Sequence, residues 1–295
     1  MSSTSSTISL TPEYEDRSDR YRRSVRVLRH NPMVLAGLAI LVIWTLIALF
    51  APVLAPTSPL RQDVMRNLEA PTQAHPFGTD ELGRDIFTRV LYGGRITMPA
   101  GILVIVIGCA LGMLVGAVAG FVGGTWDELL MRVSELFMAF PTIILALAIT
   151  AALGPDLRNS VLALVIVWWP GYARLIRGLV MEVKSREFVE GARSIGASSP
   201  YILFRTVLPN CISPALVLAT LDIGNAILAF AGLSFLGLGP DPTSPEWGRM
   251  VSTGIDYFDQ WWMWLYPGLA IAVLVLAFNF IGDGLRDILD PRMRR

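Results

Sequence analysis

Long uncharged apolar stretches alternate with shorter polar segments along the chain. A helix that crosses a bilayer needs about 20 apolar residues, and in lipid only helices and closed barrels satisfy their backbone hydrogen bonds. Five stretches are long enough: Met33–Leu54, Ile96–Thr125, Leu136–Leu153, Cys211–Leu238 and Leu265–Ile281. The pattern therefore predicts at least five transmembrane helices.

A sixth stretch is less regular. Val161–Ala173 carries no charge but is short and contains Pro170, and Arg174 and Arg177 precede the apolar Leu179–Met181. Arginine side chains can extend to the membrane interface or lie against neighbouring helices. We expect this segment to span the membrane as well, which predicts an all-α polytopic protein with six transmembrane helices.

The first span is expected to stay in the mature protein, because a polar segment of about thirty residues precedes it and it is longer than the apolar part of a signal peptide. The Ser/Thr-rich start of that segment, Ser2–Thr11, is expected to be disordered. The chain then divides into five parts: a tail (1–32), the first helix (33–55), an extracytoplasmic loop with an elbow helix (56–95), a five-helix core (96–290) and a C-terminus (291–295).

Basic residues predict the orientation of these helices. Six spans place both termini on one side, and cytoplasmic segments carry an excess of Lys and Arg. A cytoplasmic N-terminus would put most of the 24 basic residues on that side. We therefore expect both termini to be cytoplasmic.

Composition supports a membrane protein and disfavours other classes. Of the 295 residues, 53% are hydrophobic and 16% are charged, whereas about 25% are charged in soluble domains. Basic and acidic residues balance at 24 each, so no positive charge excess indicates nucleic-acid binding. The two cysteines, Cys109 and Cys211, and the two histidines, His30 and His75, form no cluster typical of a metal site. We expect no metal and no cofactor in this chain.

Glycine recurs at every fourth position of the second span, at Gly108, Gly112, Gly116, Gly120 and Gly124. Such residues share one helix face, and small residues let another membrane helix approach closely. We interpret this face as a packing surface, with a substrate-facing role as the alternative. No GxxxxGK[ST] segment is present in the sequence, so a nucleotide-binding P-loop is not expected.

Asp222 is the one acidic residue deep inside an apolar run. A carboxylate inside a membrane faces a cavity, water or a polar partner. Two interpretations remain open at this point: Asp222 lines a translocation path with nearby Asn225, or it hydrogen-bonds to another helix.

The cytoplasmic segment 182–209 mixes polar and apolar residues at helical spacing. Phe188, Ala192 and Ile195 would share one face of a short helix. Gly196 is expected to end that helix, and Ser199 with Pro200 to begin the next. A helix this apolar should dock either on a protein partner or on the membrane surface.

This segment resembles a known motif. Glu190-Gly191-Ala192, Gly196 and Leu208-Pro209 match in spacing the EAA loop of membrane subunits of binding-protein-dependent ABC importers. Gly191 stands where Ala is common, and Thr206 stands where the peptide-importer branch often has His. The resemblance implies a coupling role for these residues together with Arg193.

Further motifs are similar to the C-type permeases of dipeptide and oligopeptide importers. They are Arg29–Pro32, His75–Asp85, Leu233–Gly239, Pro245–Gly248, Gly282–Asp287 and Asp290–Arg292.

The resemblance implies a type I importer fold in the inner membrane of a prokaryote, with several partners. These are a B-type permease, two ABC ATPases that bind ATP and Mg²⁺, and an extracytoplasmic solute-binding protein. The chain itself would then be a transport subunit and not an enzyme. Peptide is the expected cargo, and nickel, glutathione or oligosaccharide are the alternatives.

The extracytoplasmic loop 239–262 contains our candidates for contact with the binding protein or for an outer gate, which are Asp241, Glu246, Trp247 and Arg249. Trp261, Trp262 and Trp264 are interpreted as an interfacial aromatic belt. In the earlier outer loop, Asp80, Glu81, Arg84 and Asp85 are expected to cap and pair around the elbow helix.

Other protein classes fit less well. An ion-coupled secondary transporter using Asp222 is the alternative from a different class, but such proteins usually show repeated halves and several intramembrane coupling groups. No filter motif indicates an ion channel. No Ser/His or paired-Asp set within the spans indicates an intramembrane enzyme.

Overall fold

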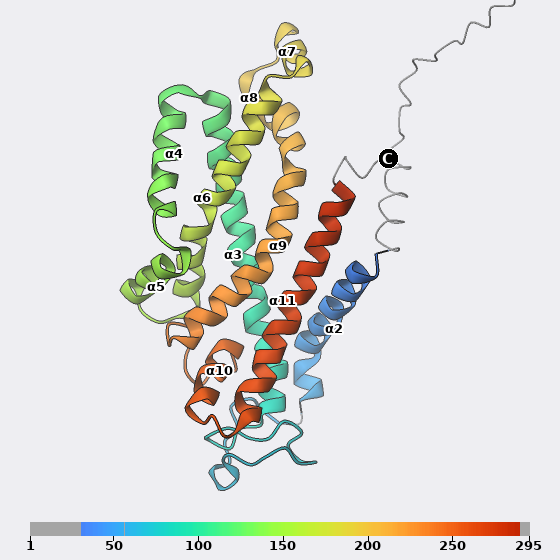
Figure 1. Ribbon diagram of the computed structural model, residues 1–295, viewed down its shortest axis with the longest axis vertical. Coiled ribbons are helices and arrows are strands. Elements are labelled where there is room, and N and C mark those ends of the chain that lie inside the picture. Colours follow the sequence, from blue (N-terminus) through green and yellow to red (C-terminus); the bar gives the residue numbers. More distant parts are fainter. Residues whose placement is uncertain (1–30, 56, 290–295) are drawn as a thin grey trace, which may run out of the picture.

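The computed structural model describes residues 31–55 and 57–289, so most of the expected N-terminal tail and the C-terminal residues 290–295 lie outside the described part. Five long helices run along the longest axis of the molecule (Figure 1). Their bounds are Pro32–Leu54 (α2), Ile86–Val122 (α3), Leu157–Lys184 (α6), Leu208–Phe235 (α9) and Trp261–Leu289 (α11). All five are long and apolar enough to cross a membrane. The structure thus confirms an all-α polytopic membrane fold.

The predicted span Leu136–Leu153 is bent. Helices α4 (Gly124–Met138) and α5 (Thr142–Leu153) meet at 88°, and together they are long and apolar enough for one broken span or a re-entrant loop. The sequence predicted a continuous apolar helix, Leu136–Leu153, with Pro141 near one end. Instead, α4 ends at Met138 and α5 begins at Thr142, directly after Pro141. A proline lacks the backbone N–H that a continuous helix needs, and it disfavours helix in the residue before it.

Helix α3 begins ten residues before the predicted second span. The Asp85 carboxylate accepts a hydrogen bond of 2.7 Å from the Thr88 backbone N–H and caps the helix. Residues 86–95 therefore belong to α3. The expected elbow helix is not formed within residues 57–85, where the one helical element is a short 3-10 turn, Val64–Arg66.

The glycine face of α3 packs against α6. A Cβ atom on Gly112 would lie 2.4 Å from the Tyr172 Cβ, and one on Gly116 would lie 2.3 Å from the Ala173 carbonyl oxygen. Gly108 and Gly120 also face α6 residues. Gly124 is not part of this contact, since it begins α4 and a Cβ there would meet no atom.

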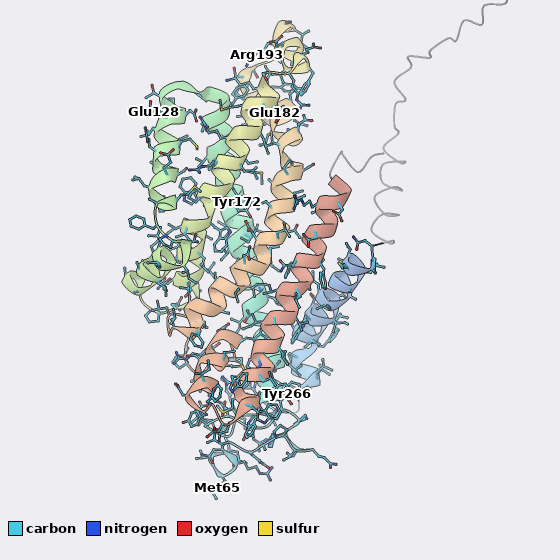
Figure 2. All side chains as sticks on the ribbon, in the orientation of Figure 1. Met65, Glu128, Tyr172, Glu182, Arg193 and Tyr266 are labelled. Carbon is cyan, nitrogen blue, oxygen red and sulfur yellow. The ribbon has the colours of Figure 1, made fainter. Side chains whose placement is uncertain are left out.

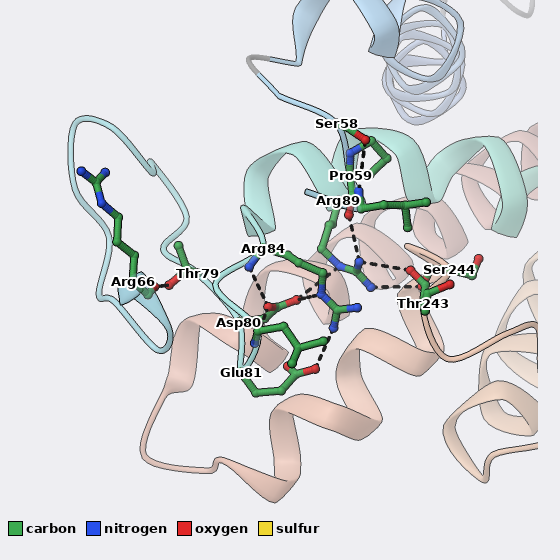
Figure 3. A network of polar contacts seen from close by, with 12 residues as sticks. Ser58, Pro59, Arg66, Thr79, Asp80, Glu81, Arg84, Arg89, Thr243 and Ser244 are labelled. Carbon is green, nitrogen blue, oxygen red and sulfur yellow. Dashed lines mark hydrogen bonds and ion pairs between the residues drawn. The ribbon is translucent and has the colours of Figure 1, made fainter. Parts of the chain in front are cut away.

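The outer ends of the helices are closed by the segment 57–85 and by α10 (Trp247–Asp256). Arg89, which is almost fully buried in α3, donates to the carbonyl oxygens of Pro59 at 3.0 Å and Ser244 at 3.1 Å (Figure 3). One side chain thus joins two outer loops that are far apart in the sequence. The start of α2 and the end of α11 point toward the opposite end, where α7 lies (Figure 1).

Candidate functional site

The segment 182–209, which the sequence predicts to be cytoplasmic, contains helix α7, Glu187–Ser194. It ends in a Schellman motif, in which the Gly196 N–H donates to the Arg193 carbonyl at 2.9 Å and the Ala197 N–H donates to the Ala192 carbonyl at 3.1 Å. Gly196 has φ +82°, a conformation that suits glycine best. The structure therefore places the end of α7 at the glycine where the sequence predicted it.

After α7 the chain returns to the bundle without a long loop. Helix α8 (Ser199–Tyr201) continues through a π-helical turn, Ile202–Val207, directly into α9. Pro209 stands where the π-helical turn passes into α9. Because a proline has no backbone N–H, it removes one hydrogen bond from this continuous helix, and a local π-helical turn is a usual way to accommodate that loss.

Helix α7 is anchored to the bundle by two apolar side chains, the buried Val189 and the partly buried Ala192. Val189 is fully buried and belongs to a cluster with Val183 of α6 and with Ile202 and Val207 of the π-helical turn. The other large apolar side chains nearby are exposed, with Phe188 at 47% and Ile195 at 86%. A displacement of α7 would therefore be transmitted to α6 and α9.

The exposed residues at this end define a surface that we call the cytoplasmic knob. Its members are Phe188, Glu190, Gly191, Arg193, Ile195, Gly196, Tyr201 and Phe204. Figure 2 shows Arg193 at the far tip of the molecule. Exposed apolar side chains gathered at one end are typical of an interaction surface, and both occupants that the sequence left open, a protein partner and the membrane surface, fit this mixture of apolar and charged side chains.

Asp222 both hydrogen-bonds to another helix and lines a cavity, so its role in a translocation path stays a prediction. Its carboxylate accepts a hydrogen bond of 2.8 Å from the Tyr172 hydroxyl of α6, and the Asn225 amide lies 3.4 Å from its other oxygen. Asp222 and Asn225 also line a cavity of about 410 Å³ between α6, α9 and the α4–α5 bend. Tyr172, which Figure 2 places midway along the long helices, was missed by the sequence reasoning because tyrosine in an apolar helix gives no distinctive signal.

The outer candidates separate into two groups. Glu246 is fully buried and caps α10, accepting hydrogen bonds from the Gly248 and Arg249 backbone N–H groups and from the Thr97 hydroxyl at 3.1 Å. Trp247 is also fully buried, and its indole N–H donates to the Val90 carbonyl at 2.9 Å. Both side chains are buried in this structure, so neither offers a surface for binding-protein contact here, and their role in an outer gate stays a prediction.

Burial also sets the electrostatics of this cap. Desolvation raises the pKa of Glu246, and the hydrogen bonds that it accepts from Gly248, Arg249 and Thr97 oppose this rise. Asp241 is exposed, and the hydrogen bonds that it accepts from the Thr243 hydroxyl and N–H lower its pKa. Asp241 and the partly exposed Arg249 remain candidates for outer contact.

The polar residues of the first outer loop pair with one another. Arg84 donates to the Asp80 carboxylate at 2.6 Å and to the Glu81 carboxylate at 2.7 Å (Figure 3). The His75 imidazole lies 2.9 Å from the Asp85 carboxylate. Within residues 31–55 and 57–289 no group of three or more His, Cys, Asp and Glu side chains could hold a metal ion.

The three tryptophans at the start of α11 do not form a uniform belt. Trp261 is exposed, and Trp264 is half-buried. Trp262 is buried and donates to the Thr79 carbonyl at 3.1 Å. Trp262 thus joins the outer loop to α11, and its buried ring adds little exposed area to the expected aromatic belt.

Comparison with protein families identifies relatives over nearly the whole chain. The profile described as "Binding-protein-dependent transport system inner membrane component" matches residues 112–295. A second profile, "N-terminal TM domain of oligopeptide transport permease C", matches residues 20–71.

Individual relatives have the same character. A dipeptide transport system permease protein of Alkalihalophilus pseudofirmus is 41% identical over 93% of this chain and 90% of the relative. A glutathione transport system permease protein of Escherichia coli is 42% identical over 91% of this chain and 89% of the relative.

One solved structure shares the fold. The chain is similar to a chain of the inward-facing MetNI methionine ABC transporter, with a TM-score of 0.54, 18% identity, and coverage of 68% of this chain and 97% of that chain.

Proposed function

Because the chain belongs to the family of inner membrane components of binding-protein-dependent transport systems, and to its peptide-permease branch, we propose that it forms half of the translocation path of an ATP-driven peptide importer. The other half would be a B-type permease. Identity of about 41% to a dipeptide permease over 93% of the chain carries this proposal. The proposal is supported by a cavity about midway along the long helices and by an exposed surface at the end that we expect to be cytoplasmic.

We propose that the cytoplasmic knob docks in a cleft of an ABC ATPase. Ile195, which is 86% exposed, and Phe188 would supply apolar contact, and Glu190 and Arg193 would supply polar contact at its rim. When two ATPases close on ATP, α7 would move as a lever. Val189 would pass this movement to α6 and α9, because packed helices shift as units.

Energy would come from the partners. ATP and Mg²⁺ would bind the ATPase subunits, and a solute-binding protein would deliver peptide to the outer face near Asp241 and Arg249. In this division of roles the chain carries no cofactor of its own and catalyses no reaction.

Glutathione is the second candidate cargo. One relative at 42% identity is a glutathione transport permease, and glutathione is itself a small peptide with a free amino group. The solute-binding protein would decide between the two cargoes.

The test is ATP hydrolysis by the assembled complex in liposomes, with and without peptide-loaded binding protein. Gly196→Ala should abolish most of the stimulation, because alanine at φ +82° costs about 1–2 kcal/mol and would reorient the end of α7. Gly178→Ala is the matched control, since a Cβ atom on this helical glycine would meet no atom within 4 Å.

We expect the stimulation of ATP hydrolysis to fall in Gly196→Ala and to be retained in Gly178→Ala. Both complexes should have the same subunit composition as the native complex. Equal stimulation in both variants and the native complex would contradict the role assigned to α7.

A further inference from the structure

The cavity beside Asp222 includes Tyr172 in its wall and so lies about midway along the long helices (Figure 2). It opens between α6, α9 and the α4–α5 bend and has a volume of about 410 Å³. Aromatic side chains form much of its wall, which includes Phe137, Phe140 and Trp168. Volumes of about 300–1,000 Å³ are usual for sites that bind small molecules.

The partly exposed carboxylate in this cavity has few protein partners. One oxygen accepts the Tyr172 hydroxyl at 2.8 Å, whereas the other has only the Asn225 amide at 3.4 Å. Among the described residues, no basic side chain forms an ion pair with Asp222. A charge at this depth is costly without a partner, so the site favours a ligand that brings positive charge.

The surroundings select among cations. A primary ammonium donates up to three hydrogen bonds, and it could use the free lone pairs of Asp222 and the Asn225 amide oxygen. The faces of Trp168 and Phe137 would attract the same charge. A transition metal fits poorly, because the described residues hold no group of three metal-ligating side chains.

We propose that this cavity is a transient binding site for the protonated amino terminus of the transported peptide. The inference rests on the proposed function, because it assigns a substrate contact within the path of a peptide importer. Every peptide with a free amino terminus carries this group, so the site would accept many sequences. Its single carboxylate would lower the cost of moving the ammonium out of water while holding it weakly enough for release.

The first test compares native, Asp222→Asn and Asp222→Glu complexes in liposomes with loaded binding protein. Dialanine uptake and ATP hydrolysis are measured together. Asp222→Asn should lower uptake about tenfold, the scale of one charge-assisted hydrogen bond, while stimulated ATP hydrolysis stays within about twofold. Asp222→Glu keeps the charge and should retain most uptake.

The matched control is Thr220→Ala. Thr220 lies on the same helix, its hydroxyl donates to the Leu216 carbonyl of α9 at 2.8 Å, and it does not line the cavity. This variant should transport like the native complex.

A second measurement probes the ammonium itself. Without binding protein, millimolar dialanine should raise the Tm of the native complex, and N-acetyl-dialanine should not. Neither ligand should stabilise the Asp222→Asn complex.

Three results would overturn the inference. The first is dialanine uptake at the native level in Asp222→Asn. The second is a loss of both uptake and ATP hydrolysis that is the same in Asp222→Asn and Asp222→Glu, and the third is a rise in Tm with N-acetyl-dialanine equal to that with dialanine. The second would show that Asp222 only holds α6 against α9. A native complex without stimulated ATP hydrolysis and uptake would overturn the proposed function itself, and this inference with it.

Discussion

At the residue scale, buried polar side chains on the outer side hold the fold together. Glu246 satisfies two backbone N–H groups at the start of α10 and the Thr97 hydroxyl of α3. Its burial was not predictable, because Thr97 lies 149 residues away in the sequence. The sequence signals of an exposed acid and of a buried helix cap are the same.

The raised pKa of Glu246 gives a pH prediction. The folded state binds the proton of the Glu246 carboxyl more tightly than the unfolded chain does. The protonated side chain therefore contributes its full share to the stability of the fold below the ordinary pKa of glutamate, and this share is lost as the pH rises through the raised pKa. Glu246→Gln cannot titrate. The Tm of the native complex minus that of the variant should therefore fall by about 3 °C between pH 5 and pH 8. A difference that stays constant would contradict the assignment.

The glycine face of α3 gives a second prediction. Gly116→Ala would place a Cβ atom 2.3 Å from the Ala173 backbone oxygen, and backbone cannot move aside cheaply. We expect a loss of about 1–3 kcal/mol in stability, measured as a lower Tm in detergent. Gly178→Ala should not lower the Tm, since the space there is open and alanine favours helix.

At the element scale, an ion pair fixes the bent span to the bundle. Arg177 of α6 forms two parallel hydrogen bonds with the Asp127 carboxylate of α4, one of them 2.7 Å long. A double-mutant cycle of Asp127→Ala and Arg177→Ala should give a coupling free energy of about 1 kcal/mol. The bidentate geometry strengthens the ion pair, whereas its partial exposure to solvent weakens it. Strictly additive effects would show that the pair does not hold α4.

The helices differ in how far the sequence determined them. The long uncharged apolar runs of α2, α9 and α11 were sufficient to predict these helices as membrane spans. The α4–α5 bend was not predictable, because the apolar run continues across Pro141 and only tertiary packing decides whether a proline kinks a helix or ends it. The end of α7 was predictable, because Gly196 acts through its own backbone.

At the scale of the whole molecule, the orientation can be tested directly. After replacement of the buried Cys109 and Cys211, single cysteines are introduced at Ile195 and at Met65, which is 94% exposed. A membrane-impermeant maleimide should label Ile195→Cys only in inside-out vesicles and Met65→Cys only in right-side-out vesicles. Labelling of both from one side would contradict the six-span topology.

The measurement that tests the central claim most directly is peptide uptake into liposomes containing the purified complex, under controlled ATP and ion gradients. We expect uptake that requires ATP on the α7 side and loaded binding protein on the other side, and that is unchanged when ionophores collapse the gradients. Uptake driven by a proton or sodium gradient without ATP would contradict the account, since Asp222 would then act in an ion-coupled secondary transporter.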